Sequence, residues 1–424
     1  MTEATATPLL EPRDGVPPVV VDEREMVRAA EALAAGTGPV AVDAERASGY
    51  RYGQAAYLVQ LRREGSGSWL VDPVGCPDLT PIGRAIAHEE WVLHAAGQDL
   101  PCLAGVGLRP TRLFDTELAA RLAGLPRGGL GAVVEQLLGL SLAKEHSAVD
   151  WSTRPLPESW LRYAALDVEV LVALRDELAE LLRDQGKLEW AEQEFAAIVA
   201  APPPPPRVDP WRRTSGVHRL RSRRQLALVR ELWGTRDAIA RKRDISPGRV
   251  LPDAAVVEAA SANPRSVDEL LGLPGFRGPA GRRHAKLWLE AVARGRHLAE
   301  AELPPHSVAS DAPPPPRAWA DRDPDAAARL AFARAALADL SERCDVPVEN
   351  LLTPDTVRRL LWSPPPPESV DAALTAYGAR PWQVELVGPV LRQALDETAA
   401  TRAERERAAQ REQATPEPVE VTAE

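Results

Sequence analysis

Three runs of consecutive prolines divide this chain and limit where continuous folding units can lie. They span residues 202–206, 313–316 and 364–367. Proline cannot continue a helix, and such runs favour the extended polyproline conformation that is typical of linkers. The first two runs therefore predict linkers between domains, whereas the third lies within a helical region and predicts a loop. A chain of 424 residues is long enough for two or three domains.

Hydrophobic patterning separates an α/β part from helical parts. Short apolar or alternating runs predict strands at residues 40–42, 55–61, 69–71 and 91–94. Apolar residues three and four positions apart predict helices at residues 130–138 and 161–182. Beyond residue 210 no convincing strand pattern remains. The chain is therefore predicted to combine an α/β domain with all-α domains.

The two later segments resemble each other, which predicts two copies of one small helical module. Residues 243–253 resemble residues 344–355, and Ser266-Val-Asp268 recurs as Ser369-Val-Asp371. The tail is rich in Glu, Arg, Gln and Thr and predicts disorder. The predicted organisation is a flexible N-terminus at 1–14, an α/β domain at 15–200, a linker at 201–210, a helical domain at 211–300, a linker at 301–320, a second helical domain at 321–397 and a disordered tail at 398–424.

Composition narrows the class of protein. Hydrophobic residues make up 45% of the chain and charged residues 26%, which is typical of a folded globular protein. No apolar run reaches the roughly 18 residues of a membrane span, and the N-terminus carries acids where a signal peptide carries basic and apolar residues. We therefore expect a cytoplasmic protein without membrane partners. Cys76, Cys102 and Cys344 are far apart and form no zinc or disulfide pattern, so they are expected to be reduced, buried packing residues.

The chemistry is most visible at Val40-Ala-Val-Asp43-Ala-Glu45. In an extended strand, side chains two positions apart point to the same face, so Asp43 and Glu45 can bind one hard cation together. A strand that ends in solvated acids is the ordinary alternative.

Two further segments carry acids that could bind a cation together with this pair. Asp99 follows a short buried strand, and the ordinary alternative for it is a helix N-cap. Asp115 is interpreted only as such a cap. Tyr163 and Asp167 lie four positions apart, on one face of a predicted helix. For that pair, a core tyrosine with a surface acid is the alternative.

Taken together, Asp43, Glu45, Asp99, Tyr163 and Asp167 resemble the motifs of the DEDD exonuclease superfamily, in its tyrosine-containing branch that includes the ribonuclease D family. The resemblance covers roughly residues 15–200 and extends to residues 45–54 and 150–156. It implies an RNase H-like domain with a mixed sheet. It also implies that Asp43, Glu45, Asp99 and Asp167 bind two divalent cations, Mg²⁺ or Mn²⁺, and that no organic cofactor is needed.

A two-metal mechanism is what this resemblance implies for the reaction. Four carboxylates in a small space repel one another unless divalent cations neutralise them, and an all-oxygen site suits magnesium or manganese. One ion is expected to activate the attacking water and the other to stabilise the leaving 3′ oxygen. Tyr163 is expected to orient that water, because a phenol with a pKa of about 10 is a poor base at neutral pH.

The local charge reverses in the first helical segment. The whole chain has a net charge of −10, but residues 211–250 hold twelve Lys or Arg against three acids, a balance of +9. This run predicts either a solvated face or a phosphate-binding surface. Residues 225–298 resemble the HRDC domain, and residues 326–397 resemble a divergent copy. The resemblance predicts non-specific RNA contacts for eight basic residues: Arg212, Arg213, Arg221, Arg223, Arg224, Arg241, Lys242 and Arg243.

The sequence therefore predicts a 3′→5′ exoribonuclease that releases nucleoside monophosphates from RNA with a free 3′ end. Precursors of tRNA are the substrate class that the resemblance implies, and protein partners are left unspecified. A DNA exonuclease is the first alternative, because related domains act on DNA. An inactive RNA-binding adaptor is the second, although all four acids and the tyrosine are present.

Overall fold

The computed structural model describes residues 6–143, 146, 148–307 and 311–413. The chain forms two compact units, each built from segments that are not consecutive in the sequence. The first unit contains Met1–Leu113, Gly139–Val172 and Ala201–Ala309, and the second contains Phe114–Leu138, Ala173–Ala200 and Ser310–Glu424. Because each unit combines separate segments of the chain, the units do not test the domain boundaries predicted from the sequence, which stay predictions.

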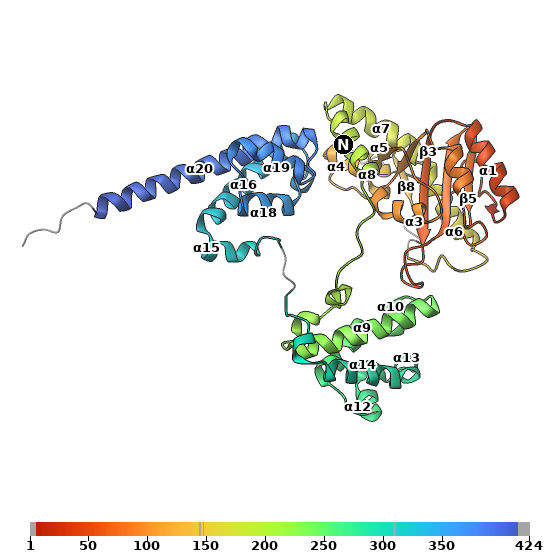
Figure 1. Cartoon of the computed structure of the whole chain (residues 1–424). Helices are drawn as coiled ribbons and strands as arrows, with labels where there is room; N and C mark the ends of the chain where they lie inside the picture. Colours follow the sequence, from red (N-terminus) through yellow and green to blue (C-terminus); the bar gives the residue numbers. More distant parts are fainter. Residues whose placement is uncertain (1–5, 144–145, 147, 308–310, 414–424) are drawn as a thin grey trace, which may run out of the picture. The chain divides into compact units, whose positions relative to one another are not determined.

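A six-stranded mixed sheet forms the centre of the α/β part, in the order β2-β5-β4-β3-β6-β7. Its strands β3 and β5 are labelled in Figure 1. β4 pairs antiparallel with β3 and β5, whereas β6 runs parallel to β3 and β2 parallel to β5. The strands are β2 Val19–Val20, β3 Thr37–Arg46, β4 Ala56–Glu64, β5 Gly67–Val71, β6 Glu90–Leu93 and β7 Arg112–Asp115. The four strands predicted from the sequence are confirmed, and so is the mixed-sheet fold class.

β3 lies in the middle of this sheet because it is apolar on both faces along its first half. Val40, Ala41 and Val42 are fully buried, as is Leu61, which lies opposite Val42 in β4. Strands buried on both faces form continuous apolar runs, as seen here. The polar half of β3 follows and carries the acids.

One helix covers the face of the sheet that bears the acids. α6 (Glu158–Glu169) packs against β3, β4 and β5, with Ala164 and Ala165 in contact with the cluster of Leu58, Leu70 and Trp151. The helix predicted at 161–182 is in fact two helices, since α6 ends at Glu169 and α7 (Leu171–Asp184) follows after Val170. The remaining helices of this part are α1 Glu23–Ala35, α2 Thr80–Ala85, α3 Leu100–Gly105, α4 Thr116–Leu122, α5 Leu130–Leu138 and α8 Leu188–Ala200.

The N-terminal segment is more ordered than its sequence suggests. β1 (Thr7–Leu9) pairs in parallel with β8 (Leu140–Leu142) in a second, two-stranded sheet. The 1–14 segment was expected to be flexible, and its residues 1–5 lie outside the described residues. Backbone pairing explains the difference, because β8 gives hydrogen-bond partners to the main chain of Thr7–Leu9, whose side chains stay largely exposed.

The first helical module is α9 to α14 in the first unit. Its helices are α9 Arg223–Arg243, α10 Pro247–Val250, α11 Asp253–Ala262, α12 Val267–Gly272, α13 Pro279–Arg283 and α14 Ala285–His297. Leu232, Phe276 and Trp288 are fully buried in its core. The described residues 201–307 contain no strand, as the sequence predicted.

The second helical module belongs to the second unit, together with α4, α5 and α8. Its helices are α15 Trp319–Arg322, α16 Pro324–Cys344, α17 Val348–Leu351, α18 Pro354–Trp362, α19 Val370–Ala376 and α20 Pro381–Gln413. The ring of Trp190 in α8 stacks on that of Trp382 in α20, with centroids 4.9 Å apart. Part of the predicted 301–320 linker is packed as well, because fully buried Trp319 donates its indole N–H to the Pro314 carbonyl at 2.8 Å.

The repeat seen in the sequence is a repeat of structure. α9 and α16 are each 21 residues long, and each ends at an aspartate in the left-handed conformation, Asp244 at φ 48° and Asp345 at φ 49°. A four-residue helix follows in both copies, α10 and α17. Aspartate is one of the few residues that adopt this conformation readily. These shared features support the predicted relation between the two modules, which as a whole stays a prediction.

The C-terminal tail differs from its prediction. α20 continues to Gln413, so residues 398–413 are helical where disorder was expected, and residues 414–424 lie outside the described residues. The composition that suggested disorder is rich in Ala, Glu, Arg and Gln, which are also good helix formers, and the segment extends a helix that has already begun.

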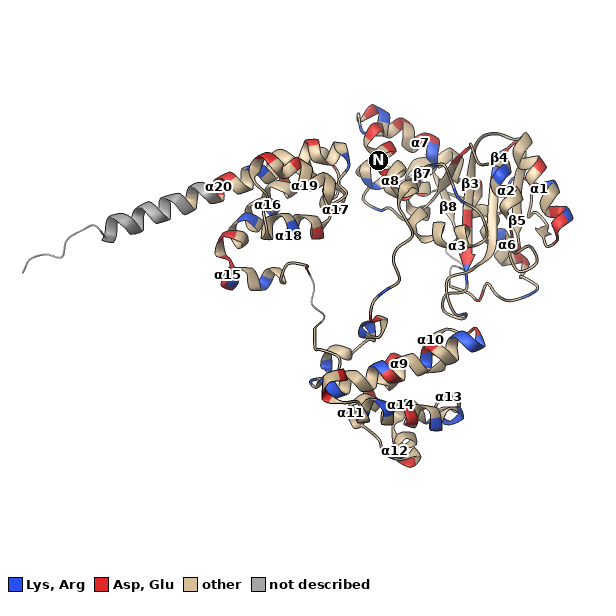
Figure 2. Cartoon of the chain, in the orientation of Figure 1, with Lys and Arg blue, Asp and Glu red and all other residues tan. Residues whose placement is uncertain are grey.

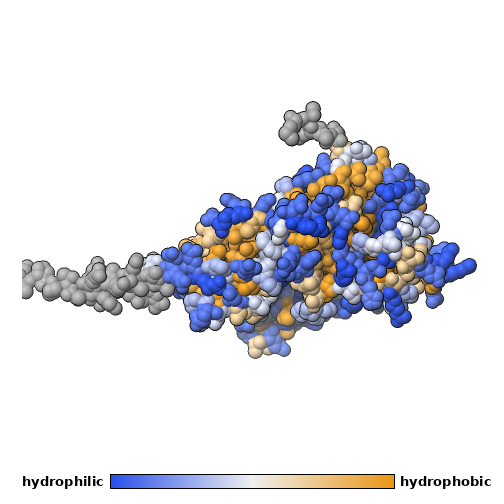
Figure 3. Space-filling view, turned by 90° about the horizontal axis from the view of Figure 1, so that it is seen from above, coloured by the Kyte–Doolittle hydropathy of each residue, from blue (hydrophilic) through white to orange (hydrophobic). Residues whose placement is uncertain are grey.

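The surface and the cysteines agree with the composition. No helix in the described part of the chain is long and apolar enough to cross a membrane. The face in Figure 3 is largely hydrophilic with smaller apolar areas between the polar ones. Cys76 and Cys102 are buried free thiols as expected, but the prediction of burial was wrong for Cys344, whose free thiol is partly exposed near the end of α16.

Candidate metal-binding nuclease site

β3 presents two acids on one face at the point where its apolar half ends. Asp43 and Glu45 alternate with Val42 and Ala44, which are buried on the other face of the strand. Both acids are only partly exposed to solvent. The period of two in a strand therefore produces the predicted pair of neighbouring carboxylates.

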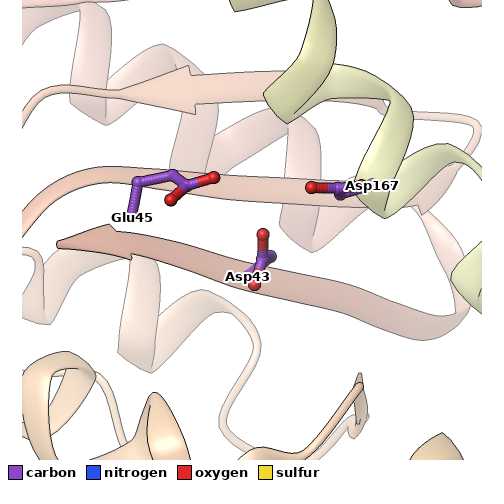
Figure 4. A group of neighbouring side chains, drawn as sticks. All are labelled: Asp43, Glu45 and Asp167. Atoms are coloured by element: carbon purple, nitrogen blue, oxygen red, sulfur yellow. The ribbon is translucent and has the colours of Figure 1, made fainter. Parts of the chain in front are cut away.

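α6 brings a third acid to the same place from a distant part of the sequence. Asp167 points toward Asp43 and Glu45, and ligand atoms of all three carboxylates lie within 4.8 Å of one another (Figure 4). Tyr163, one turn earlier in α6, hydrogen-bonds through its hydroxyl to Asp167. The predicted helical pair of tyrosine and aspartate thus faces the strand pair.

Asp99 lies at the edge of this cluster and is buried. Its carboxylate is 3.6 Å from the guanidinium of Arg46, and its charge contributes to raising the pKa of Glu45. Asp99 occupies the N-cap position of α3 but makes no capping bond with its side chain. Its side chain is therefore not used as the helix cap that was the alternative interpretation.

Asp115, by contrast, is a helix cap. Its carboxylate accepts hydrogen bonds from the backbone N–H groups of Glu117 and Leu118 at the start of α4. The prediction that Asp115 is a helix cap is confirmed. The side-chain hydrogen bonds distinguish Asp115 from Asp99, whose side chain makes no capping bond.

The acids perturb one another strongly. Burial and the neighbouring charges of Asp43, Asp167 and Asp99 raise the pKa of Glu45 to about 10. Burial also raises the pKa of Asp43, and burial together with the charge of Asp43 raises the pKa of Asp167 well above its usual value. The pKa of Tyr163 is raised for the same two reasons, so its phenol stays protonated at neutral pH.

This donor set fits a hard divalent cation. All the clustered ligand atoms are carboxylate oxygens, the ligands that magnesium and manganese prefer. Carboxylates that are buried close together stay protonated when nothing else neutralises their charge, because ionising them costs free energy. A bound cation removes that cost. The fully buried Gln60, opposite Asp43 in β4, leaves both its amide atoms without a hydrogen-bond partner among the described residues, so a polar group near the acids remains to be satisfied.

Two pockets flank the carboxylates. One, of about 300 Å³, is lined by Ala44, Glu45, Arg46, Ser48, Gly49, Tyr50, Ala148 and Val149. The other, of about 280 Å³, is lined by Leu9, Leu10, Glu11, Leu142, Ala143, His146, Ser159, Arg162, Tyr163, Leu166 and Asp167. The sequence interpretation did not name most of these residues as functional. The only signal for the first pocket is that Ser48, Gly49 and Tyr50 fall within the 45–54 segment of family resemblance.

The eight basic residues predicted to contact RNA fall into two groups. Figure 2 shows basic residues along α9 and at α10 and α13. Four of the eight are held by bonds within the protein; their partners are Asp209 for Arg212, the Leu303 carbonyl for Arg223, the Leu298 carbonyl for Arg224, and the Tyr52 hydroxyl for Arg241. The other four are exposed and have no side-chain hydrogen bond or ion pair with any described residue: Arg213, Arg221, Lys242 and Arg243.

Family models match most of the chain. Residues 18–183 match the model described as 3′-5′ exonuclease, residues 225–292 match the HRDC domain, and residues 312–395 match the 3′ to 5′ exonuclease C-terminal domain. The mixed sheet, the clustered carboxylates and these matches define a 3′→5′ exonuclease.

Relatives identify the family. Ribonuclease D of Gluconacetobacter diazotrophicus is 32% identical over 337 residues, which cover 77% of this chain and 82% of the relative. Ribonuclease D of Escherichia coli is 32% identical over 271 residues, covering 62% of this chain and 71% of the relative. The chain belongs to the ribonuclease D family of 3′→5′ exoribonucleases.

Solved structures agree with this assignment. A protein from Bifidobacterium adolescentis is 37% identical with a TM-score of 0.85, covering 92% of this chain and 100% of that chain. The structure of Escherichia coli RNase D, described as an exoribonuclease involved in structured RNA processing, is 26% identical with a TM-score of 0.66, covering 90% of this chain and 98% of that chain.

Proposed function

We propose that Asp43, Glu45, Asp99 and Asp167 hold two divalent cations, Mg²⁺ or Mn²⁺, and that Tyr163 acts beside them in hydrolysing the 3′-terminal phosphodiester bond of RNA. The observation that carries this proposal is the convergence of Asp43, Glu45 and Asp167 within 4.8 Å, with the Tyr163 hydroxyl bonded to Asp167. Bound cations would supply Lewis-acid stabilisation of phosphoryl oxygens and a more acidic water.

The chain's own groups have separate tasks in this proposal. Tyr163 remains a neutral phenol and positions the attacking water through hydrogen bonds, because its raised pKa makes it a poor base. Arg46 holds the carboxylate of Asp99 in place at 3.6 Å. The pocket beside Glu45 receives the terminal nucleotide, since it is the concave surface adjacent to the acids on the strand side.

We further propose tRNA precursors as the substrate and the cytoplasm as the location. Structured RNA processing by the Escherichia coli relative supports this substrate class. Four exposed basic residues can attract phosphates without sequence preference: Arg213, Arg221, Lys242 and Arg243. Structured RNA presents phosphates over a larger surface than the end of a single strand does, so such contacts favour structured RNA.

The test is a time course on 3′-extended tRNA, mature tRNA and a matched single-stranded DNA, each with Mg²⁺, Mn²⁺ or EDTA. We expect stepwise shortening of the extended tRNA with either metal, release of nucleoside monophosphates, and a loss of at least about 100-fold in rate for Asp43→Asn. Asp115→Asn is the matched control, because it changes a buried aspartate that caps a helix.

The other outcomes separate the alternatives. Faster digestion of DNA than of RNA identifies a DNA exonuclease. Binding of RNA without shortening in any metal identifies an adaptor. Equal loss of activity in Asp43→Asn and Asp115→Asn contradicts the assigned role of the acid cluster.

A further inference from the structure

The loop that follows Glu45 forms one wall of the pocket beside the acids. This 47–53 loop leads from β3 to β4, and its residues Ser48, Gly49 and Tyr50 line the pocket of about 300 Å³. Within the α/β part it is tethered by two side chains. The Tyr50 hydroxyl donates to the Ala148 carbonyl at 3.3 Å, and the guanidinium of Arg51 donates to the Ser152 hydroxyl at 2.7 Å.

The same loop is held from the other side by the first helical module, which lies in the same compact unit. Arg249 of α10 donates to the Gly49 carbonyl at 2.8 Å, and its guanidinium lies over the Tyr50 ring at 4.2 Å. The backbone N–H of Ser246 donates to the Tyr50 carbonyl at 2.9 Å. Two of the three pocket-lining loop residues are therefore fixed directly by the module.

Tyr52 anchors the loop more deeply. Its ring packs against the apolar core of the module, and its hydroxyl donates to Asp237 at 3.0 Å and accepts from Arg241 at 3.1 Å. Its backbone N–H donates to Asp244, the left-handed aspartate that ends α9, at 3.3 Å. The Tyr52 anchor thus combines apolar burial with hydrogen bonds of both main chain and side chain, which is stronger than an exposed ion pair alone.

The corresponding edge of the second module is also a contact edge, within its own unit. Lys187 is buried and donates to the carbonyls of Leu122 at 2.9 Å and Asp345 at 3.2 Å, and Glu349 of α17 lies 3.9 Å from Arg121. Asp345 is the equivalent of Asp244, and α17 is the equivalent of α10. Both copies therefore use the left-handed aspartate and the short helix after it to contact residues outside their own bundle.

We infer that the first helical module positions the 47–53 loop and so shapes the pocket beside Glu45. Arg249 and Tyr52 are positioning residues in this inference, and Arg241 stabilises the loop rather than binding RNA. The inference rests on the proposed function only in assuming that this pocket receives the terminal nucleotide. A nucleotide held by a loop with few internal bonds needs that loop fixed, since a displacement of about 1 Å at a reacting group can lower the rate on the order of 100-fold.

The experiment uses the full-length chain with Arg249→Met and Tyr52→Phe, singly and combined. Hydrogen exchange of residues 47–54 measures loop order without reference to activity. Steady-state shortening of 3′-extended tRNA gives kcat and KM, and filter binding of the same RNA in EDTA gives affinity. Arg265→Met is the matched control, because Arg265 is an exposed arginine of the same module with no side-chain bond to any described residue.

We expect the combined variant to exchange its loop amides about tenfold faster and to lose about tenfold or more in kcat, with RNA affinity within about twofold of Arg265→Met. Arg249→Lys should recover part of the loss, because it can still donate to the Gly49 carbonyl. Unchanged exchange in residues 47–54, or a loss confined to RNA affinity, would overturn the inference. If wild type lacks nuclease activity, the exchange result still decides whether the module orders the loop.

Discussion

Gln60 carries a side chain that its surroundings do not satisfy. It is fully buried in β4 and lies opposite Asp43 in β3, yet neither amide atom has a hydrogen-bond partner among the described residues. Directly opposite residues of an antiparallel pair have Cβ atoms about 5 Å apart and point to the same face. The Gln60 amide can therefore form hydrogen bonds with groups that bind beside Asp43 in the active site.

Replacing Gln60 with leucine should separate stability from activity. An unpaired buried amide costs about 1–3 kcal/mol, so Gln60→Leu should leave the free energy of unfolding unchanged or raise it. Activity should fall about 10- to 100-fold, as when the support of a metal ligand is removed. Denaturant unfolding and single-turnover assays check both parts. Leu70→Met, a core change at the position paired with Gln60 in β5, should keep its activity, and full activity in Gln60→Leu would show that the amide is dispensable.

Arg154 fixes the segment that carries Ala148 and Val149 into the pocket. Its guanidinium donates to both carboxylate oxygens of Asp72, at 2.7 and 2.6 Å, and to the carbonyl of Trp151 at 2.8 Å. The Asp72 side chain is only 8% exposed, which makes this pair much less accessible to water than an ordinary surface ion pair.

Breaking the Arg154 pair should therefore destabilise the protein. Arg154→Met leaves Asp72 buried without its partner, and we expect a loss of about 2–4 kcal/mol in the free energy of unfolding. Arg28→Met, which removes an exposed pair with Glu25, should change it by less than about 0.5 kcal/mol. The double variant Arg154→Met with Asp72→Leu should recover part of the loss, and no recovery would mean that the backbone bonds of Arg154 dominate.

At the scale of elements, the junction of α8 with α20 rests on one buried acid. Glu194 accepts from the indole N–H of Trp382 and from the Nε of Arg380, both at 3.0 Å. The stacked rings of Trp190 and Trp382 lie beside these bonds. Apolar area and a charged network thus hold the first turns of α20 to α8.

Removing the acid should loosen this junction. Glu194→Leu leaves the Trp382 N–H without an acceptor and Arg380 without its partner, so we expect a loss of about 2–4 kcal/mol in the stability of the second unit. Glu194→Gln keeps a neutral acceptor for Trp382 and should lose less. Hydrogen exchange of α20 localises the effect, and Glu192→Gln, an exposed change in the same helix, provides the baseline. Equal protection in all three variants would contradict the role of Glu194.

The sequence predicted the elements best where periodicity and composition agree. The buried run of β3 and the tyrosine and aspartate four apart in α6 are local patterns, and both were predicted together with the candidate site residues that they carry. The break at Val170 and the pairing of β1 with β8 depend on distant contacts that no local pattern encodes. For the same reason, neither local charge nor the HRDC resemblance distinguished the four of the eight basic residues that bond within the protein.

At the scale of the whole molecule, the acid cluster is a source of instability that a cation can relieve. Three neighbouring acids, Asp43, Asp99 and Asp167, are close enough to raise the pKa of Glu45, and this repulsion is present in the folded state alone. Any ligand that binds only the folded chain raises its stability by mass action, by about 2.7 kcal/mol at 100 times its dissociation constant.

Magnesium should therefore raise the melting temperature of the wild-type protein relative to EDTA. Asp43→Asn removes one of the like charges, so we expect it to melt at a higher temperature than wild type in EDTA and to gain less from magnesium. Differential scanning calorimetry measures both. Asp115→Asn should respond to magnesium as wild type does, and an equal magnesium response in Asp43→Asn would place the binding site elsewhere.

The metal-free protein should also lose stability as pH rises. Glu45 has a pKa of about 10 in the folded protein against an ordinary 4.5, so between these values the folded state binds a proton that the unfolded chain has released. The contribution of Glu45 to stability is complete below pH 4.5 and declines as pH rises toward 10. Unfolding midpoints in EDTA across this range test the slope, which Glu45→Gln should flatten; a variant with the wild-type slope would assign it to other groups.

The equal lengths of α9 and α16 have a geometric consequence. Each residue of a helix turns the chain by about 100° and advances it by about 1.5 Å, so 21 residues fix both the direction of the terminal aspartate and its distance, about 32 Å, from the start of the helix. Deleting one residue near the exposed Gly234 would rotate Asp244 away from Tyr52 by more than a quarter of a turn. Deleting seven would restore its direction within about 20° while shortening the helix by about 10 Å. Restoring the direction does not restore the distance, so the contact of Asp244 with Tyr52 depends on the full length of α9.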